Sequence, residues 1–343
     1  MKKDKESSNP SPQLPQNDII PSMKRRADFN DYQGRHIYMI TMTLEGRKPL
    51  LGSLNAPSPD KATIDLSPMG EAVCDCWQAI PRLHPEVSLI VFQVMPDHFH
   101  GLLFVTKDME AGLGRVIRGF KQGCDKAFRR LLPDLAAEAS KRQAMEKGKK
   151  KRGFFFEIGY NDRILIEEDQ LHTLINYILD NPRRLSLRQS SASFFHVHTN
   201  YPIAGKACSV QGNLALLKRK CLQVRISRGI SPEALAIEQQ RLLRLAQDGA
   251  VLVSPCISPG EKTIMREAFN LQLPIIVLLD KGIDPISKPY GERFDACADG
   301  RLLLISPFPY STRRKTITRD ECMQLNALAF AIANHEQYQE RHQ

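Results

Sequence analysis

The chain has 343 residues, of which 42% are hydrophobic, and a formal net charge of +10 at pH 7. This length favours two domains, and the apolar content is sufficient for both to fold around cores. No apolar run approaches the ~20 residues needed to span a bilayer, and no signal-peptide pattern is present, so we expect a soluble, cytoplasmic protein. The excess of basic residues favours a polyanionic partner, either nucleic acid or an anionic membrane surface.

The N-terminal residues 1–27 are rich in Lys, Ser, Pro, Asn and Gln and lack apolar periodicity, which is typical of a disordered basic tail. The β-branched and aromatic pattern of Gly34–Leu44 predicts a first strand, followed by a turn at Glu45–Arg47. Residues Pro68–Leu83 are predicted to form a short helix.

Two buried strands are predicted next, Val87–Met95 and a second one beginning near His98, with a turn at Pro96 and Asp97. Side chains alternate between the faces of a strand, so His98 and His100 project to the same side. Such a pair can supply two metal ligands. A His-x-His pair is also compatible with a purely structural role in which hydrogen bonds satisfy both rings.

A helix is predicted over Leu113–Leu132 from its apolar spacing, with basic residues between the apolar positions. This basic side is either a solvated helix face or a surface for phosphate groups. Seven lysines and arginines follow within Leu135–Gly153, which we interpret as a mobile basic insertion.

A second helix is predicted over Glu167–Asn181, with Pro182 ending it. Tyr177 lies to one side of its apolar stripe, in line with Asn181 one turn later. The stripe consists of Leu171, Leu174, Ile175, Ile178 and Leu179.

These residues form a coherent chemical set. The imidazoles of His98 and His100, with the side-chain oxygen of Asn181, could hold Mg²⁺ or Mn²⁺ through mixed nitrogen and oxygen ligands. Such an ion would polarise a phosphodiester, and Tyr177 would attack phosphorus to leave a covalent phosphotyrosine and a free 3′-hydroxyl.

The same region resembles a known family through four motifs in a fixed order. They are Met95–His100 (MPDHFH), Arg118–Lys121 (RGFK), Gly159–Ile164 (GYNDRI) and Asn176–Pro182 (NYILDNP). Together they resemble the HUH single-tyrosine transposases, in particular the REP-associated tyrosine transposases of the insertion-sequence-200-like group. The resemblance covers about residues 28–200.

The resemblance implies a ferredoxin-like antiparallel sheet flanked by helices, and hairpin-bearing single-stranded DNA as the substrate. It also implies that His98, His100 and Asn181 are metal ligands and that Tyr177 is the nucleophile. Asp97 departs from the asparagine that is usual before the first histidine. The basic insertion after Leu132 is a second departure, and we expect neither to touch the chemistry directly.

Two further motifs compete with this assignment. Tyr160 lies in a family-like motif but has no metal-ligand partner one helical turn away, so we interpret it as a packing or phosphate-contacting residue. His196 and His198 form a second His-x-His pair, whose flanking residues predict a peripheral strand or loop and a structural role.

The C-terminal third is predicted to contain a linker, residues 201–213, and then a Rossmann-like domain, residues 214–335, with a parallel α/β sheet. Four short buried-strand runs support this, at 221–226, 250–254, 274–279 and 301–305, with helices at 231–247 and 260–271.

This part resembles the DNA-processing protein A family through Ser227-Arg228, the loop 280–284 and residues 302–309. That resemblance implies a domain that binds single-stranded DNA. The loop 254–262 carries prolines and bulkier side chains in place of the family's glycines. A domain used for packing or oligomerisation is therefore an equal alternative.

The sequence thus predicts an α+β protein, a ferredoxin-like HUH domain (28–200) followed by a Rossmann-like α/β domain. The leading hypothesis is a metal-dependent single-stranded DNA endonuclease and strand transferase, associated with the nucleoid and able to act as a homodimer. The alternative is a non-catalytic module that binds single-stranded DNA. The residues expected to contact the DNA backbone are Arg115, Arg118, Lys121, Arg183 and Arg184.

Overall fold

The structure, a computed structural model, describes residues 32–145, 153–167, 169–311 and 316–334. The chain divides into two compact units, residues 1–186 and 187–343. The predicted disordered tail, residues 1–27, lies outside the described residues. Among the described helices, none combines the length and apolar character needed to cross a bilayer.

The first unit contains six strands, six α-helices and two 3₁₀ turns among its described residues. The strands are β1 (Ile37–Thr43), β2 (Gly52–Asn55), β3 (Thr63–Leu66), β4 (Val87–Met95), β5 (His98–Val105) and β6 (Asn161–Leu165). The helices are α1 (Pro68–Gln78), α2 (Ile80–Leu83), α3 (Leu113–Leu131), α4 (Pro133–Met145), α5 (Asp169–Leu179) and α6 (Asn181–Ser190), and the 3₁₀ turns are η1 (Glu45–Arg47) and η2 (Pro59–Lys61). The division between the units falls within α6.

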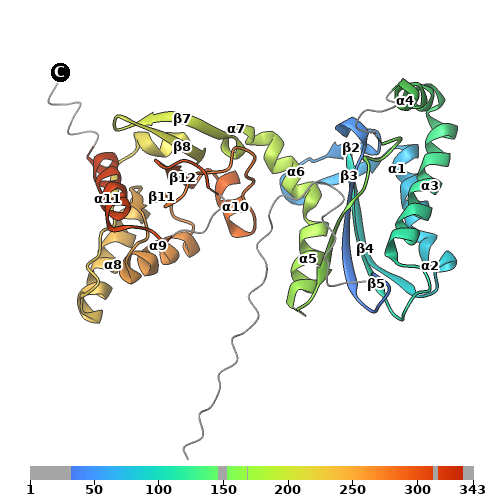
Figure 1. Cartoon of the computed structure of the whole chain (residues 1–343). Coiled ribbons are helices and arrows are strands. Elements are labelled where there is room, and N and C mark those ends of the chain that lie inside the picture. Colours follow the sequence, from blue (N-terminus) through green and yellow to red (C-terminus); the bar gives the residue numbers. More distant parts are fainter. Residues whose placement is uncertain (1–31, 146–152, 168, 312–315, 335–343) are drawn as a thin grey trace, which may run out of the picture. The chain divides into compact units, whose positions relative to one another are not determined.

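Four of these strands form an antiparallel sheet in the order β4-β5-β1-β6, and β2 and β3 form a separate hairpin. With α1 between β1 and β4 and α3 between β5 and β6, the chain follows the β-α-β-β-α-β order of a ferredoxin-like fold. The predicted ferredoxin-like antiparallel sheet is therefore confirmed (Figure 1).

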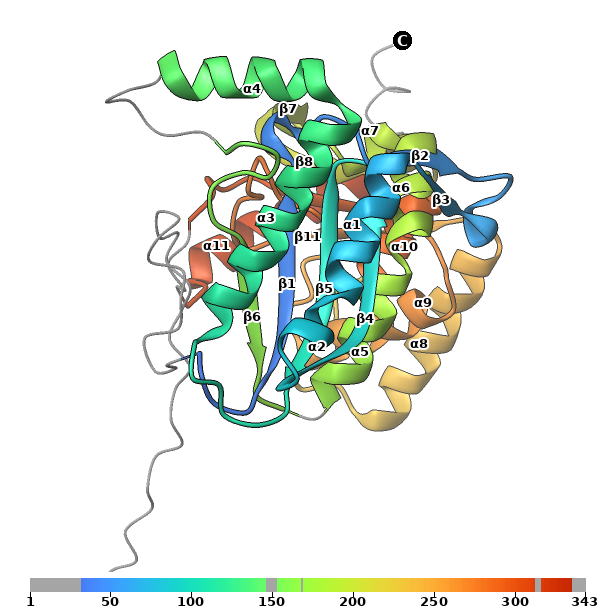
Figure 2. The same ribbon diagram turned by 90° about the vertical axis from the view of Figure 1, so that its right-hand side faces the viewer.

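One face of this sheet is covered by α1 and α3, which lie side by side in front of the strands in Figure 2. The ring of Trp77 from α1 lies 4.7 Å from that of Phe99 on β5 and 5.2 Å from that of Phe120 on α3, measured between centroids. Phe99 is fully buried in this core. The middle residue of the His-x-His motif therefore anchors β5 to the helical layer.

Close packing of Trp77 onto β5 requires a glycine at position 101. A Cβ atom added to Gly101 would clash with the indole of Trp77 and come within 2.8 Å of Phe99 Cε1. We expect Gly101→Ala to lower the free energy of unfolding by about 1–3 kcal/mol, measured by urea denaturation. Gly119→Ala is the matched control, because nothing lies within 4 Å of its added Cβ in α3. It should raise stability by about 0.5–1 kcal/mol, and equal effects of the two changes would contradict this packing.

The opposite face is covered by α5 at one end only, as Figure 1 shows. Leu174 and Ile178 of α5 pack there against Leu102 of β5 and Leu165 of β6. The other end of the same face carries His100 and His98, two and four residues before Leu102 on β5.

One element prediction for this unit needs correction. Residues 135–145 of the predicted mobile insertion belong to α4, because Pro133 begins a helix and alanine-rich sequence sustains it despite the basic charge. Residues 146–152 lie outside the described residues. Helix α5 ends at Leu179, so the predicted end of this helix before Pro182 is confirmed to within two residues. Pro182 is the second residue of the next helix, α6, where proline is tolerated because its missing N–H would be unpaired.

The second unit contains strands and helices in alternation. The strands are β7 (Val197–Ile203), β8 (Lys206–Gly212), β9 (Cys221–Gln223), β10 (Val251–Ser254), β11 (Ile275–Leu278) and β12 (Leu302–Ser306). The helices are α7 (Ala192–Phe195), α8 (Pro232–Gln247), α9 (Pro259–Asn270), α10 (Glu292–Ala298) and α11 (Arg319–Ala333), with the 3₁₀ turn η3 (Leu214–Lys218).

The sheet of this unit has the order β7-β8-β12-β11-β10-β9, in which β9 to β12 are parallel. One apolar core joins α8, α9 and α10 to one face of the sheet, and a second joins α11 and η3 to the other. The predicted α/β domain with a parallel sheet is confirmed, extended by an antiparallel hairpin.

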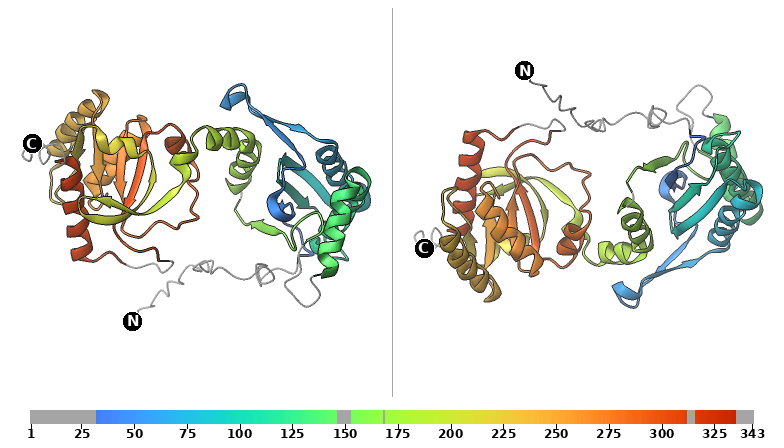
Figure 3. Two further views of the ribbon diagram at one scale, coloured as in Figure 1. Left: turned by 90° about the horizontal axis from the view of Figure 1, so that it is seen from above. Right: turned by 90° about the horizontal axis from the view of Figure 1, so that it is seen from below.

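That hairpin occupies the segment predicted as a linker, so the linker prediction is wrong. Residues 201–212 lie in β7, β8 and the turn between them, Asn213 is the N-cap of η3, and β8 pairs antiparallel with β12 (Figure 3). The turn residues Ala204 and Gly205 both have positive φ values, 47° and 74°, as a two-residue hairpin turn requires. Residues 187–200, predicted to end the first domain, also belong to the second unit.

Candidate functional site

The His-x-His motif lies at the start of β5, directly after a tight connection from β4. The register pairs Met95 with His98 and Gln93 with His100, so the hairpin fixes the position of both histidines. Their ring centroids are 4.8 Å apart and the rings cross at 87°. The predicted placement of both rings on one face of a core strand is confirmed.

A row of polar residues crosses the sheet at this level. His100 pairs with Gln93 on β4 and with Thr41 on β1, and Thr41 pairs with Asn161 on β6. Directly paired residues in an antiparallel sheet share a face. Four neighbouring strands therefore present polar side chains on the face where α5 packs. This end of the face is polar and does not belong to the apolar core under α5.

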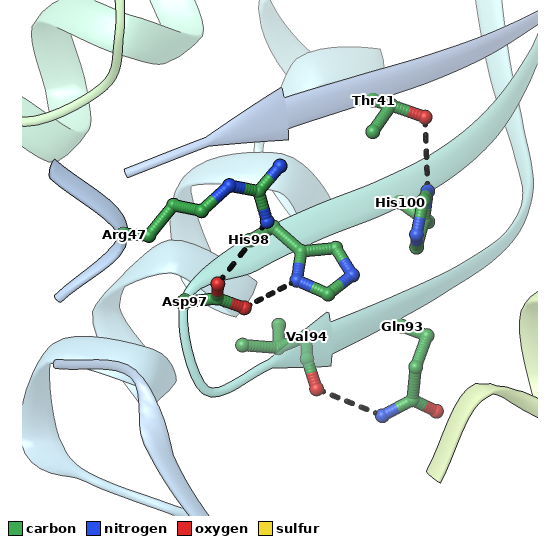
Figure 4. A network of polar contacts seen from close by, with 7 residues as sticks. All are labelled: Thr41, Arg47, Gln93, Val94, Asp97, His98 and His100. Carbon is green, nitrogen blue, oxygen red and sulfur yellow. Dashed lines mark hydrogen bonds and ion pairs between the residues drawn. The ribbon is translucent and has the colours of Figure 1, made fainter. Parts of the chain in front are cut away.

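Each histidine is held through Nδ1 by a neighbouring side chain (Figure 4). His98 Nδ1 lies 2.5 Å from Oδ1 of Asp97, and Oδ2 of Asp97 lies 3.3 Å from Nη1 of Arg47. His100 Nδ1 lies 2.9 Å from the hydroxyl oxygen of Thr41. Asp97, which we expected to stand apart from the chemistry, thus contacts a candidate ligand directly.

The hydrogen bond from His98 holds the pKa of the Asp97 carboxyl below its usual value, and Arg47 adds to this effect. A carboxylate accepts hydrogen bonds, so His98 Nδ1 is the donor in its contact with Asp97. Thr41 fits the same role as acceptor for His100. In a neutral ring whose Nδ1 is the donor, Nε2 carries the lone pair, and Figure 4 shows the second nitrogen of each ring facing the space between the rings.

This donor set fits a divalent cation that takes nitrogen and oxygen ligands. A ligating histidine usually donates its other ring N–H to a carboxylate or another acceptor, as His98 does. Within the described residues, no group of three or more His, Cys, Asp or Glu side chains could hold a metal ion. An ion bound by His98 and His100 would therefore draw its other ligands from amides, water or substrate, and Asn181 is the predicted amide.

Tyr177 lies beside this pair, as predicted. Its ring centroid is 5.9 Å from that of His100, with the rings inclined at 72°. The side chain is 38% exposed, although its neighbour Ile178 is fully buried in the core below. The packing of α5 on the sheet therefore fixes the position of Tyr177. Its ring lies beside the histidine pair and remains accessible to solvent.

Asn181 begins α6, one turn after Tyr177, and is buried. Its side-chain Nδ2 donates to the backbone oxygens of Tyr177, at 2.9 Å, and Ile178, at 3.3 Å. These bonds tie the asparagine to the turn that carries the tyrosine. They use the NH₂ end of the amide, and the oxygen is the end that can ligate a cation.

The five predicted DNA-contacting residues fall into two groups. Arg115 and Arg118 are exposed on α3, in the helical layer behind the sheet and away from the histidine face. Lys121, also on α3, donates to the backbone oxygens of Glu157 and Gly159, and burial lowers its pKa to about 8. The structure does not bring these three residues to the histidine pair.

Arg183 and Arg184 lie on α6 next to the site. Arg183 donates from Nε and Nη2 to the two carboxylate oxygens of Asp180, at 2.6 and 3.1 Å. The guanidinium carbon of Arg184 lies 5.6 Å from the ring centroid of Tyr177. Among the five residues predicted to contact DNA, Arg184 is therefore the one whose positive charge lies beside Tyr177.

Sequence reasoning missed Thr41, Gln93 and Arg163 as members of this face. Arg163 is exposed on β6, two residues along from Asn161, and so lies on the same side. The period-2 alternation of β1 and β6 could have assigned each residue a face, but only the strand register shows which residues become neighbours of His100.

The two competing motifs lie elsewhere. Tyr160 is partly buried against the core formed with α1 and α3, in agreement with a packing role. His196 and His198 lie at the start of β7, the edge strand of the second sheet, where the sequence predicted a peripheral strand. Their ring centroids are also 4.8 Å apart.

No protein-family model matches the chain. An uncharacterized protein of Haemophilus influenzae is 26% identical over 85 residues, which are 25% of this chain and 44% of that protein, so the match spans less than half of the relative. A REP-associated tyrosine transposase bound to a REP hairpin has a TM-score of 0.28 at 13% identity, over 46% of this chain and 73% of that one. DNA processing protein A from Helicobacter pylori, described for its single-stranded DNA binding mode, has a TM-score of 0.32 at 17% identity, over 41% of this chain and 68% of that one. These similarities are partial, and the chemistry assigned to this chain rests on its own motifs and on the site described above.

Proposed function

We propose that this chain is a divalent-metal-dependent endonuclease and strand transferase for single-stranded DNA, with Tyr177 as its nucleophile. The observation that carries the proposal is the meeting of Tyr177 with His100, at 5.9 Å between ring centroids, on a polar sheet end. A tyrosine used only for packing would be expected in the stripe with Leu174 and Ile178, which is buried. Tyr177 instead stays solvent-accessible beside two oriented imidazoles.

In the proposed reaction, the Tyr177 hydroxyl loses its proton and its oxygen forms a bond to phosphorus. The bond from phosphorus to the 3′ oxygen breaks, and that oxygen takes up a proton. The products are a 5′-phosphotyrosine and a free 3′-hydroxyl. A divalent cation held by His98, His100 and Asn181 would polarise the phosphodiester and stabilise the charge that develops on it.

The covalent link allows strand transfer without an external energy source. A 3′-hydroxyl can attack the phosphotyrosine in the reverse sense, which restores the phenol of Tyr177 and joins the DNA strands. The polar row along the sheet and the exposed face of α6 supply surroundings for a sugar-phosphate backbone. A hairpin-bearing strand is the substrate that the sequence motifs favour.

Arg184 should contribute to DNA binding because its cation lies beside Tyr177. We expect Arg184→Ala to weaken binding of single-stranded DNA and to lower the slope of log affinity against log salt by about one, measured by fluorescence anisotropy. Arg82→Ala is the control, an exposed arginine on α2 in the opposite helical layer. Equal losses for both variants would contradict a DNA path across the Tyr177 face.

The proposal is tested by incubating the full-length chain with end-labelled, hairpin-bearing single strands and Mn²⁺. The expected result, with a strand labelled at its 3′ end, is a labelled band that survives denaturing electrophoresis and does not form when EDTA is present from the start. Binding that is insensitive to EDTA, with no covalent product on any strand of a hairpin library, would instead identify a non-catalytic single-stranded DNA-binding module.

A further inference from the structure

The structure contains two His-x-His pairs whose rings have nearly the same geometry. The rings of His98 and His100 cross at 87°, and those of His196 and His198 at 81°, each with centroids 4.8 Å apart. Ring spacing therefore does not distinguish a metal-binding pair from a structural one. The surroundings do, because Asp97 and Thr41 hold the rings of the first pair, and no such side-chain bond is found for the second among the described residues.

The contact from Asp97 sets the tautomer of His98. An ionised carboxylate can only accept a hydrogen bond, so the ring nitrogen 2.5 Å away must carry the hydrogen. A neutral imidazole has one N–H, which leaves Nε2 with the lone pair that a cation needs. If His98 turned or changed tautomer, the pair would lose one of its two donors.

Arg47 holds Asp97 from the other side. Its Nη1 lies 3.3 Å from Oδ2 of Asp97, while Oδ1 serves His98. Arg47 has φ of 51°, in the left-handed region that favours glycine or asparagine. An arginine at this turn position directs its guanidinium to the carboxylate beside the histidine pair.

We propose that Asp97, held by Arg47, is a positioning residue that fixes His98 with Nε2 free for a divalent cation, and so makes His98 and His100 the metal-binding pair. This inference rests on the function proposed above, since it assigns the control of that same cation site. The family that this chain resembles usually has asparagine at this position. Aspartate at position 97 is compatible with the proposed chemistry because its carboxylate positions His98.

The side chain of Asp97 can be removed without dismantling the turn. Leu44 N donates to the backbone oxygen of Asp97 at 2.9 Å, and Leu51 N donates to that of Pro96 at 3.0 Å. Both bonds belong to the main chain and persist in Asp97→Ala. In Asp97→Asn the amide oxygen can still accept from His98 Nδ1, although it carries no charge.

The test measures Mn²⁺ affinity by electron paramagnetic resonance on the full-length chain without DNA. Asp97→Ala should weaken binding by roughly 10–100-fold, the usual effect of removing an outer partner of a ligating histidine. Asp97→Asn should show a smaller loss, and the double variant His196→Ala/His198→Ala should bind as the unchanged chain does. Thermal unfolding of each variant verifies that it is folded.

A second readout requires no metal. Long-range ¹H–¹⁵N NMR of the imidazoles at pH 8, with His98→Ala to assign the signal, should show His98 as the Nδ1–H tautomer and a mixture of tautomers in Asp97→Ala. If His98→Ala abolishes Mn²⁺ binding but Asp97→Ala changes neither affinity nor tautomer, the positioning role is wrong while the proposed function stands. An unchanged chain that neither binds Mn²⁺ nor forms a DNA adduct would overturn both.

Discussion

Tyr177→Phe is expected to abolish the covalent protein–DNA product while leaving the fold and DNA binding in place. The variant removes only the hydroxyl oxygen, so its ring can still pack 5.9 Å from that of His100. Without this nucleophile the reaction has no covalent route, and loss of a nucleophile typically lowers turnover by ~10³-fold or more. Denaturing electrophoresis of the labelled strand measures the product, and anisotropy measures binding.

Tyr160→Phe is the matched control for this prediction. Tyr160 lies in a motif that also resembles the family, but its side chain packs partly buried against the core with α1 and α3. Its loss of a hydroxyl should leave adduct formation within a few-fold of the unchanged chain. Adducts that persist in Tyr177→Phe and vanish in Tyr160→Phe would reverse the two assignments.

The second large effect is expected from the histidines. His98→Ala or His100→Ala removes one of the two nitrogen donors that face the same space, so we expect Mn²⁺ affinity to fall by at least about a hundredfold. Cleavage should fall with it, since the cation stabilises the charge on the scissile phosphate. Isothermal titration with Mn²⁺ and the labelled-strand assay measure the two quantities on the same preparations.

The second His-x-His pair supplies the control here. Alanine at both His196 and His198 removes rings with the same 4.8 Å centroid spacing from an edge strand of the other unit. Metal affinity and cleavage should both remain as in the unchanged chain. Loss of cleavage in this variant, together with retained activity of His98→Ala and His100→Ala, would move the active site to the second unit.

Much of the fold and the central residues of the site could be predicted from local pattern. Alternation along a strand is enough to put His98 and His100 on one face, and helical periodicity is enough to separate Tyr177 from the buried stripe. Both inferences use neighbours within four residues in the sequence. They agree with the observed positions because the local geometry of strands and helices leaves little choice.

The partners of the histidines could not be predicted in the same way. Thr41 meets His100 across 59 positions of sequence, through the register of β1 with β5. Arg47 reaches Asp97 from a turn 50 positions away. A shift of one residue in either register would exchange these neighbours, and no local pattern fixes that register.

The mobile insertion and the linker are wrong element predictions, because local conformational preference determines the structure of both segments. In residues 135–145 the lysines and arginines suggested a mobile insertion, although alanine, glutamate and arginine are good helix formers. Residues 201–213 are predicted as a linker. Ala204-Gly205, flanked by alternating residues, is nevertheless a suitable hairpin turn.

The central claim is that Tyr177 is the residue that becomes joined to DNA at a cation site formed by His98 and His100. The most direct measurement is mass spectrometry of the trypsin-digested adduct formed with Mn²⁺. We expect a nucleotide mass on the peptide 164–183, whose single tyrosine is Tyr177. A nucleotide on the peptide 153–163, which contains Tyr160, or on any peptide of the second unit would contradict it.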